Sequence, residues 1–499
     1  MSERTPDRYL TTDHLMGDLR GLVVRNGIVA FSTKILRTIV MVATTAVLAR
    51  ILTPEDFGIV AIGLVVTGLV AIFADSGLPT ATINKKDLTA REVSGLFWIN
   101  LGLGVVSAFV ISALTPFIAW LYSDNRLVGV TIWLSLTVVL NLAFIQHRAL
   151  MVRQMHWIAI RSIEIGSVFA GCLVGIVAAF LGASYWALVA MHITMASVSL
   201  IFFWIVCGWR PAFTVPFKEL RQSLAFGGNL TAVIFLNFSS RQLDDLLVGW
   251  MWGVKTLGFY NRAYQLLILP ISQLTGPLSG VIVPTMSRLQ DDPIQWKTMY
   301  LNTLGALSFL MAPIGVALIV FSKDTVLLLL GNQWQPAIPI FRLLAISLLV
   351  QPILETNAWI YISQGKTNRM FKWSLIETPV IIGSFVVGLP FGAEGVALAY
   401  SLAIIALAIP NLLFAFAGTN LALLDVAKTV WRPFLGAGIA AAVSWLCLYY
   451  FAPETSLIRL ILGLAIFGTT YAVVMIGGLG FLPYLRSLMN DLSLKKTID

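Results

Sequence analysis

Two basic side chains, Lys34 and Arg37, interrupt a long apolar stretch near the start of the chain. Their spacing of three residues puts both on one face of a helix. No acidic residue occurs between Leu22 and Leu48 to pair with them locally. A cation at the centre of a bilayer costs roughly 2.5–3.5 kcal/mol, so such residues normally face a protein interior or a water-filled cavity. The pattern favours two cavity cations that bind an anionic substrate. The alternatives are an ion pair with another helix, or a Lys34 that reaches towards the cytoplasmic surface.

A second cluster combines charges of both signs on a later apolar stretch. Arg241 can pair with Asp244 or Asp245 along its own helix, at i+3 or i+4. Alternatively, the two acids face Lys34 and Arg37 across a cavity and form a gate or ion-coupling site, because intramembrane acids often relay protons. Three further acids in or near apolar stretches stand alone in the sequence, and these are Glu164, Glu355 and Glu377.

The segment Gln146–Trp157, called the basic segment below, is rich in basic and aromatic residues. Arg148 and Arg153 suit the headgroup layer of a membrane, where basic side chains meet lipid phosphates. Two interpretations stay open for this pair. The arginines either hold the chain in its orientation or contact a lipid diphosphate that enters from the cytoplasmic side.

Residue patterns typical of enzymes and metal sites are missing from the sequence. Gly365-Lys366-Thr367 resembles the end of a phosphate-binding loop, but Ile360 stands where that loop needs a glycine. Three cysteines, far apart in apolar runs, and four histidines have no metal-ligand spacing. We therefore expect no catalytic residue, no metal, no cofactor and no disulfide framework.

The composition indicates a protein whose solvent is lipid. Hydrophobic residues make up 58% of the 499 residues and charged residues only 11%, whereas soluble domains carry about 25% charged residues. The net charge of +9 comes from Lys and Arg scattered over short loops. Because they form no basic block, nucleic acid is excluded as a partner.

Apolar runs long enough to cross a bilayer recur from end to end, which predicts an all-α integral membrane protein with about 14 transmembrane helices. The expected spans are residues 22–48, 57–79, 95–121, 127–145, 161–181, 184–207, 224–249, 263–283, 300–321, 338–362, 370–388, 394–416, 433–451 and 457–480. The apolar stretch Val326–Leu330 is too short to span and is expected at the interface. Lys and Arg concentrate in alternate loops, in the set that includes both termini, so both termini are expected in the cytoplasm.

The chain repeats itself at an offset of 200 residues. Gly27 matches Gly227, Leu36 matches Leu236, and Phe57-Gly58 matches Leu257-Gly258. Because six spans separate the copies, both enter the membrane with the same orientation, as in parallel repeats related by an axis along the membrane normal. We expect two six-helix lobes around a central cavity plus two C-terminal helices, which is the architecture of a carrier. The expected parts are a cytoplasmic segment 1–21, an N-lobe 22–207, a linker 208–223, a C-lobe 224–416, two further spans within 417–480 and a cytoplasmic tail 481–499.

Five short strings, in order along the chain, carry a resemblance to a known family. They are Leu48-Ala-Arg-Ile-Leu-Thr-Pro-Glu-Asp-Phe-Gly58, Gln146-His-Arg-Ala-Leu-Met151, Gly258-Phe-Tyr-Asn-Arg-Ala-Tyr264, Ser287-Arg-Leu-Gln-Asp-Asp292 and Leu330-Gly-Asn-Gln-Trp334. Together they resemble polysaccharide flippases of the colanic-acid-exporter type, which belong to the multidrug/oligosaccharidyl-lipid/polysaccharide exporter superfamily. The resemblance covers residues 20 to 420.

This resemblance implies a multi-pass protein of the bacterial inner membrane that moves undecaprenyl-diphosphate-linked oligosaccharide to the periplasmic leaflet. The product would serve exopolysaccharide, capsule or lipopolysaccharide assembly. The implied partners are lipid-linked oligosaccharide, membrane lipids, and a polysaccharide polymerase with its export machinery; the oligomeric state stays open. Lys34 and Arg37 match the family's cavity cations by location and not by a motif.

Two other functions are compatible with a polytopic chain. A drug/cation antiporter of the same fold would need a cavity dominated by acids, whereas the first span offers Lys34 and Arg37. A membrane polysaccharide polymerase or ligase would need a large outer loop with charged catalytic residues, and the predicted outer loops are short. The sequence therefore favours a carrier over an enzyme.

The predicted orientation can be tested with reporter fusions after Arg221, Asp292 and Trp334. We expect cytoplasmic reporter activity at the first two positions and periplasmic activity at Trp334, because basic residues are concentrated in the first two loops. A periplasmic signal at Asp292 would contradict both the orientation and the number of spans.

Overall fold

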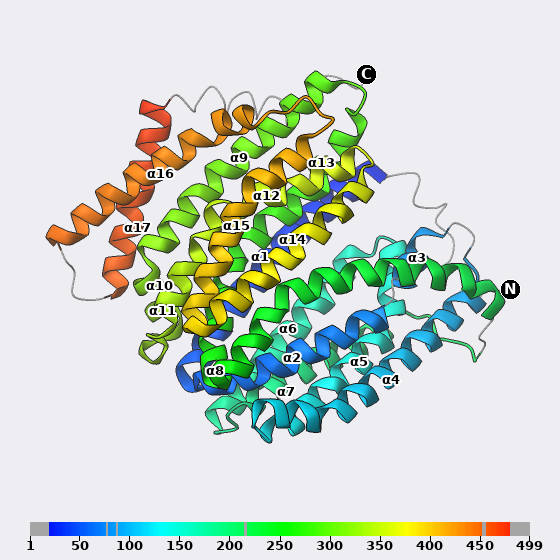
Figure 1. The fold of residues 1–499 in the computed structure, drawn as a ribbon. Coiled ribbons are helices and arrows are strands. Elements are labelled where there is room, and N and C mark those ends of the chain that lie inside the picture. Colours follow the sequence, from blue (N-terminus) through cyan, green and yellow to red (C-terminus); the bar gives the residue numbers. More distant parts are fainter. Residues whose placement is uncertain (1–18, 76–77, 86–87, 214–216, 452–455, 480–499) are drawn as a thin grey trace. The chain divides into compact units, whose positions relative to one another are not determined.

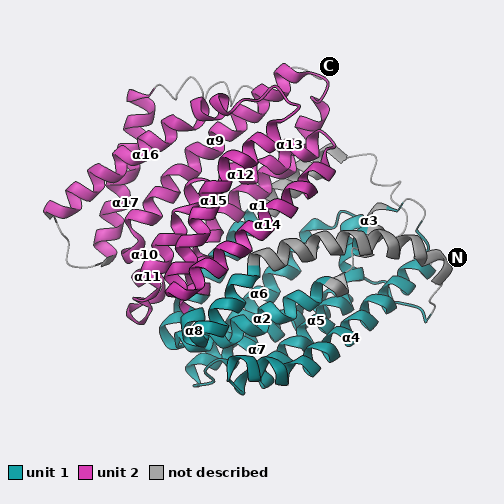
Figure 2. Ribbon diagram, in the orientation of Figure 1, with its two compact units in different colours: residues 1–258 teal, residues 259–499 magenta. Residues whose placement is uncertain are grey.

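The computed structural model describes residues 19–75, 78–85, 88–213, 217–451 and 456–479, with side chains omitted at 19–31, 73–75, 78, 81, 84, 217–241, 451 and 456. The described part is helical throughout (Figure 1). It divides into two compact units, unit 1 (Met1–Gly258) and unit 2 (Phe259–Asp499), coloured separately in Figure 2. The expected lobe boundaries stay a prediction.

Unit 1 contains seven complete helices and the first part of an eighth. They are α1 (Leu19–Ile51), α2 (Pro54–Asp75), α3 (Leu78–Asn84), α4 (Ala90–Tyr122), α5 (Arg126–Arg153), α6 (Trp157–Phe180), α7 (Trp186–Val206) and α8 (Phe217–Arg288). The backbone of α8 breaks at Gly253, where φ is 83° and ψ is 166°, so that α8 is two helices joined by a kink. Glycine allows this conformation because it lacks a Cβ.

Unit 2 contains the rest of α8 and the helices that follow. They are α9 (Pro293–Val320), α10 (Ser322–Leu330), α11 (Ala337–Ala345), α12 (Gln351–Glu355), α13 (Asn357–Ser363), α14 (Thr367–Gly388), α15 (Gly392–Phe416), α16 (Leu423–Phe451) and α17 (Ser456–Val473), which ends in a π-helical turn. The stretch Val326–Leu330 lies in α10, whose nine residues are too few to span a bilayer.

Ten helical segments of the described chain are long and apolar enough to cross a membrane, and the bent pair 337–349 and 351–363 makes eleven. Large apolar side chains point outward from them, as on α4, where Phe109 is 75% exposed. Such exposure is unfavourable in water and neutral in lipid. The structure is therefore an all-helical membrane protein with ten to eleven candidate spans in its described part, and the expected count of fourteen stays a prediction.

Helices α1 and α6 pack against one another and run in the same direction. Thr44 of α1 shares a hydrogen bond with Cys172 of α6. Near the other end of the pair, Lys34 of α1 lies close enough to Arg161 of α6 for their charges to repel. Ten residues separate the two positions on α1 and eleven on α6, so both helices advance together.

The 200-residue repeat reappears as a close backbone contact between α2 and α8. A Cβ built on Gly58 would overlap the carbonyl group of Val254, and a Cβ built on Gly258 would overlap the carbonyl group of Pro54. Positions 54 and 254, like 58 and 258, are 200 residues apart. The contact is therefore self-complementary, as expected where a two-fold axis relates two copies.

Alanine at Gly58 or Gly258 should separate these backbones and destabilise the protein by about 1–3 kcal/mol, the usual effect of overpacking. Gly102 and Gly166 are matched controls, because nothing lies within 4 Å of a Cβ built on either of these helical glycines. Thermal unfolding of the purified protein should show a lower midpoint for G58A and G258A than for G102A and G166A. Equal midpoints would mean that the contact is not tight.

Candidate functional site

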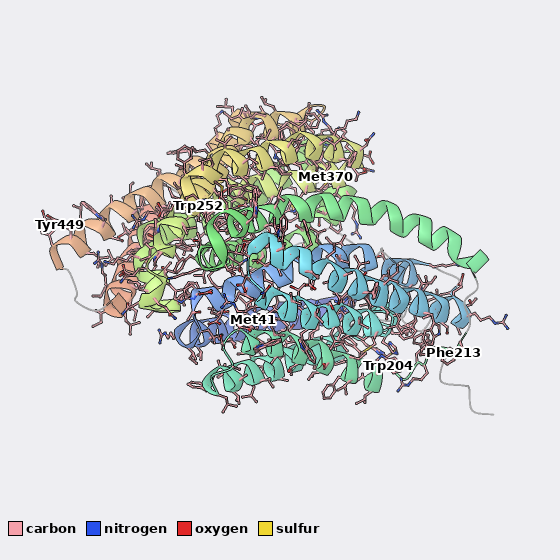
Figure 3. The ribbon with its side chains drawn as sticks, turned by 60° about the horizontal axis from the view of Figure 1, so that its bottom comes forward. Met41, Trp204, Phe213, Trp252, Met370 and Tyr449 are labelled. Atoms are coloured by element: carbon pink, nitrogen blue, oxygen red, sulfur yellow. The ribbon has the colours of Figure 1, made fainter. Side chains whose placement is uncertain are left out.

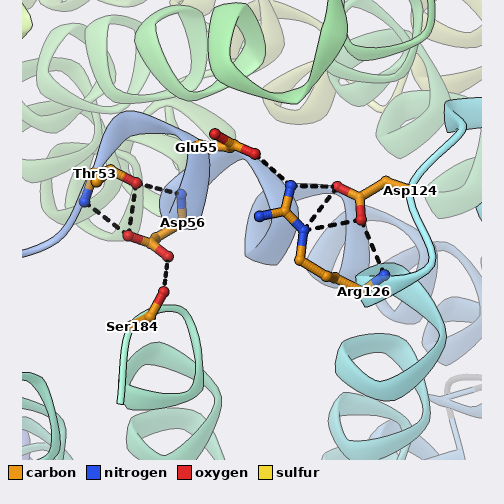
Figure 4. A network of polar contacts seen from close by, with 6 residues as sticks. All are labelled: Thr53, Glu55, Asp56, Asp124, Arg126 and Ser184. Carbon is orange, nitrogen blue, oxygen red and sulfur yellow. Dashed lines mark hydrogen bonds and ion pairs between the residues drawn. The ribbon is translucent and has the colours of Figure 1, made fainter. Parts of the chain in front are cut away.

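One end of unit 1 is closed by hydrogen bonds between helix turns (Figure 4). Thr53 begins α2 as a cap: its amide and hydroxyl donate to Asp56 Oδ2 at 2.8 and 2.7 Å, and Asp56 N donates back to Thr53 Oγ1 at 3.3 Å. The hydroxyl of Ser184, in the α6–α7 turn, donates to the other carboxylate oxygen of Asp56. These bonds tie the α1–α2 turn to the α6–α7 turn.

Arg126 joins a third turn to the same end. Its guanidinium binds Asp124 at 2.8 Å within the α4–α5 turn and also pairs with Glu55 at the start of α2. Burial alone would raise the pKa of Asp124, but the hydrogen bonds and charge of Arg126 outweigh it and lower that pKa. The string 48–58 thus supplies residues that hold three turns together, and its partners Arg126 and Ser184 were not recognised in the sequence.

The opposite end of unit 1 is held together by the basic segment. Helix α5 runs from Arg126 to Arg153, so the two ends lie roughly 40 Å apart at 1.5 Å per residue. Gln146 accepts a hydrogen bond of 2.8 Å from Thr82 of α3. The ring of His147 stacks on Trp204 of α7 at 4.7 Å, and Figure 3 shows Trp204 at the same end of unit 1 as Phe213.

Arg153 lies inside the protein, with only 7% of its surface exposed. Its guanidinium donates to the carbonyl oxygens of Thr82 and Ile83 at 3.2 Å each, and to that of Lys85. It therefore satisfies carbonyls at the C-terminus of α3, which no longer have partners within the helix. This buried position does not support the predicted contact of Arg153 with a lipid headgroup, which stays a prediction.

Arg148 has a different environment, because it forms a charge cluster with Glu164 and Arg161. Glu164 Oε1 accepts from Arg148 Nη2 at 3.2 Å and from Nε at 3.3 Å, while its Oε2 accepts from Arg161 Nη1 at 2.7 Å. The expectation that Glu164 stands alone was wrong, because Glu164 pairs with both arginines. Its partner Arg148 is on another helix and 16 residues away in the sequence. The cluster carries one net positive charge.

Of the two predicted cavity cations on α1, Lys34 lies beside this cluster. Lys34 is half-buried, Arg37 is exposed, and Lys34 is the residue repelled by Arg161. Lys34 precedes the end of α1 at Ile51 by about 26 Å, and Arg161 precedes the end of α6 at Phe180 by about 29 Å. Lys34 and Arg161 therefore lie far from the Arg126 end of unit 1.

Asp244 and Asp245 are buried on α8 at another level of unit 1. They precede the kink at Gly253 by about 13 Å, and the Gly58–Gly258 contact places that kink level with the end of α1. Along the helix axes Lys34 and Arg37 lie roughly 8–13 Å further from that end than the acids, and the gate between the two groups stays a prediction. The side chain of Arg241 lies outside the described residues, so its pairing with the acids stays a prediction.

The fold as a whole is similar to that of two solved membrane transporters. The inward closed structure of lipid II flippase MurJ has a TM-score of 0.68 and 16% identity, and covers 90% of this chain and 99% of that chain. An inward-facing multidrug resistance MATE family transporter of the MOP superfamily has a TM-score of 0.53 and 18% identity, and covers 79% and 95%. The chain therefore has the all-helical fold of these membrane transporters.

The sequence itself gives the family. Residues 47–339, more than half of the chain, match the family described as "Polysaccharide biosynthesis protein", and the chain belongs to that family. The match contains all five strings that carried the resemblance, which is thereby confirmed.

Curated relatives cover most of the chain. Lipopolysaccharide biosynthesis protein WzxC of Escherichia coli (strain K12) is 27% identical over 71% of this chain and 73% of its own length. Teichuronic acid biosynthesis protein TuaB of Bacillus subtilis (strain 168) is 24% identical over 67% and 70%. Succinoglycan biosynthesis transport protein ExoT of Rhizobium meliloti (strain 1021) is 25% identical over 69% and 70%.

The structural role of Arg153 makes a specific prediction. R153Q should lower the stability of the protein by about 1–3 kcal/mol, because buried carbonyl groups lose their donors. R91Q removes an exposed arginine of the neighbouring α4 and should leave stability unchanged. Thermal unfolding of both variants measures the difference. A normal unfolding midpoint in R153Q, combined with weaker lipid binding, would instead assign Arg153 to lipid contact.

Proposed function

We propose that this protein is a flippase that moves undecaprenyl-diphosphate-linked oligosaccharide repeat units across the bacterial inner membrane. The product serves exopolysaccharide, capsule or lipopolysaccharide assembly. Family membership and the transport and biosynthesis roles named for the relatives support this function. The observation that carries it is the gathering of Lys34, Arg148 and Arg161 at one level, with Arg37 three residues along α1 from Lys34, in a fold shared with a lipid flippase.

The proposed architecture has 14 spans with both termini in the cytoplasm. The spans are α1, α2, α4 to α7, the two parts of α8, α9, the bent pair, and α14 to α17. The self-complementary contact of Gly58 and Gly258 supports two parallel repeats related by a two-fold axis. In this orientation the Arg153 end of unit 1 is cytoplasmic and the Arg126 end is periplasmic.

The cations suit the first step of transport, in which a diphosphate leaves the cytoplasmic headgroup layer. Transfer of this anion into hydrocarbon is prohibitive unless opposite charge accompanies it. Arg37 can bind phosphate oxygens with two parallel hydrogen bonds, whereas Lys34 acts as a point charge. We assign both residues to substrate binding, and Arg148 to contact with the same headgroup.

The buried acids suit a later step. Asp244 and Asp245 lie nearer the periplasmic end than the cations, at a level where a diphosphate would be repelled unless they are protonated or paired. Proton or cation coupling at this level is therefore the role we assign to them. These acids are also the observation that favours the second candidate function, a drug/cation antiporter of the same fold.

The proposed function predicts the phenotype of a deletion strain. Removing the gene should abolish surface polysaccharide and leave lipid-linked repeat units in the inner leaflet, where a membrane-impermeant label reaches them in inside-out vesicles but not in right-side-out spheroplasts. The intact gene should restore export. R37A should restore it at least tenfold less efficiently, because loss of a charge-assisted hydrogen bond costs roughly 1.5–3 kcal/mol, and R37K should be intermediate.

Membrane abundance is the control, since R37A removes an exposed cation and should accumulate normally. Export at the normal rate in R37A would remove this residue from the site. Repeat units that reach the periplasmic leaflet of the deletion strain but stay unpolymerised would replace the flippase with an enzyme. Loss of drug resistance with intact polysaccharide would favour the antiporter.

A further inference from the structure

The charge cluster has one carboxylate between two guanidinium groups. Glu164 gives one oxygen to each arginine, at 3.2 Å to Arg148 Nη2 and at 2.7 Å to Arg161 Nη1. The longer distance exceeds the 2.7–2.9 Å usual for charge-assisted hydrogen bonds. Glu164 therefore holds Arg161 firmly and Arg148 loosely.

The two arginines offer more donors than Glu164 can use. Each guanidinium has five N–H groups. Within the described residues, both guanidinium groups donate their hydrogen bonds to the carboxylate of Glu164. The Nε of Arg161 is buried and has no hydrogen-bond partner there. The ring of Trp157 lies 5.8 Å from the Arg161 guanidinium carbon and fixes this side chain by a cation–π contact.

The cluster can be reached from outside the helices that build it. The side chain of Arg148 is 40% exposed, that of Arg161 28% and that of Glu164 18%. The cluster itself carries one net positive charge, and Lys34 of α1 lies near Arg161. An anion with more charge and more oxygens than a carboxylate would meet this excess better.

We propose that Arg148 and Arg161 form a phosphate-binding site that Glu164 occupies when no ligand is bound, and that the ligand displaces Glu164. The ligand chemistry is a phosphate ester or diphosphate on a lipid; taking it to be polyprenyl diphosphate rests on the proposed function. Glu164 acts as an internal competitor. It keeps both arginines paired in the empty carrier and returns to them when the substrate leaves, so that binding stays reversible.

Glu164→Gln isolates this role, because glutamine keeps the size of the side chain and removes its charge. We expect E164Q to bind undecaprenyl diphosphate on the order of tenfold more tightly than the unchanged protein, in nanodiscs of phosphatidylcholine. Export by E164Q should nevertheless be slower, because release is slower. R148K and R161K should bind the same lipid several-fold more weakly, since lysine cannot replace the two-pronged contact of arginine.

Glu92→Gln is the matched control. Glu92 also pairs with a cation, Lys85, in unit 1, and as the third residue of α4 it completes a capping box with Thr89 that glutamine preserves. E92Q should leave affinity for the lipid unchanged. Equal affinities of E164Q, E92Q and the unchanged protein would overturn the proposal.

Two further arms keep the outcomes distinct. If E164Q fails to accumulate, the variant E164D tests the proposal instead. The shorter carboxylate cannot bridge both arginines, so tighter lipid binding than in the unchanged protein supports displacement and equal binding refutes it.

Nanodiscs containing phosphatidylglycerol distinguish between the two sources of lipid phosphate. If E164Q bound only phosphatidylglycerol more tightly, the phosphate site would stand and the proposed substrate would be contradicted. If E164Q showed normal export and unaltered lipid binding, the phosphate site would be refuted and the proposed function would stand.

Discussion

The cost of placing charge in a low-dielectric membrane is the constraint on which the arrangement of unit 1 depends. Apart from Asp244 and Asp245, the charges described above lie towards the two ends of a bundle of long apolar helices, and at each end charged pairs join elements. At one end Glu55, Asp124 and Arg126 hold turns together, and at the other Arg148, Glu164 and Arg161 join α5 to α6. The same constraint makes the closeness of Lys34 to Arg161 informative, because like charges repel strongly at low dielectric.

Much of the helical framework follows from the sequence, because lipid forces every span to satisfy its own backbone hydrogen bonds and therefore to appear as a long apolar run. The bend within 337–363 was not predicted, since a short break barely changes hydropathy. The kink at Gly253 falls in the gap expected between the spans 224–249 and 263–283. The partners of the charged residues were not predicted for another reason. The ion pairs Arg148–Glu164 and Arg126–Glu55 form only when helices pack together, and no local sequence pattern predicts them.

The basic segment shows why a recognisable string need not be a binding motif. Gln146 and His147 contact α3 and α7, and Arg153 satisfies carbonyl groups of α3, so most of the string serves packing. Of its two arginines, Arg148 keeps a substantial exposed surface. From the sequence, Arg148 and Arg153 were assigned the same role because both are arginines in one basic segment. Their burial differs in the structure. Arg153 is buried against carbonyl groups and stabilises the fold, whereas Arg148 is paired loosely with Glu164 and can exchange its partner.

The repeat conserves backbone geometry while its two copies differ in chemistry. Gly58 and Gly258 occupy equivalent positions and make equivalent contacts. Each glycine, because it lacks a side chain, allows the backbone near the other glycine to approach closely. Lys34 and Arg37 have Ile234 and Asn237 as their counterparts, and Asp244 and Asp245 have Thr44 and Thr45. Positive charge thus belongs to one copy at one level, and negative charge to the other copy at another level. Under the proposed function, a diphosphate would meet attractive charge at the level of Lys34 and Arg37 and repulsive charge at the level of Asp244 and Asp245. Its passage beyond the acids would then require that they be protonated or paired.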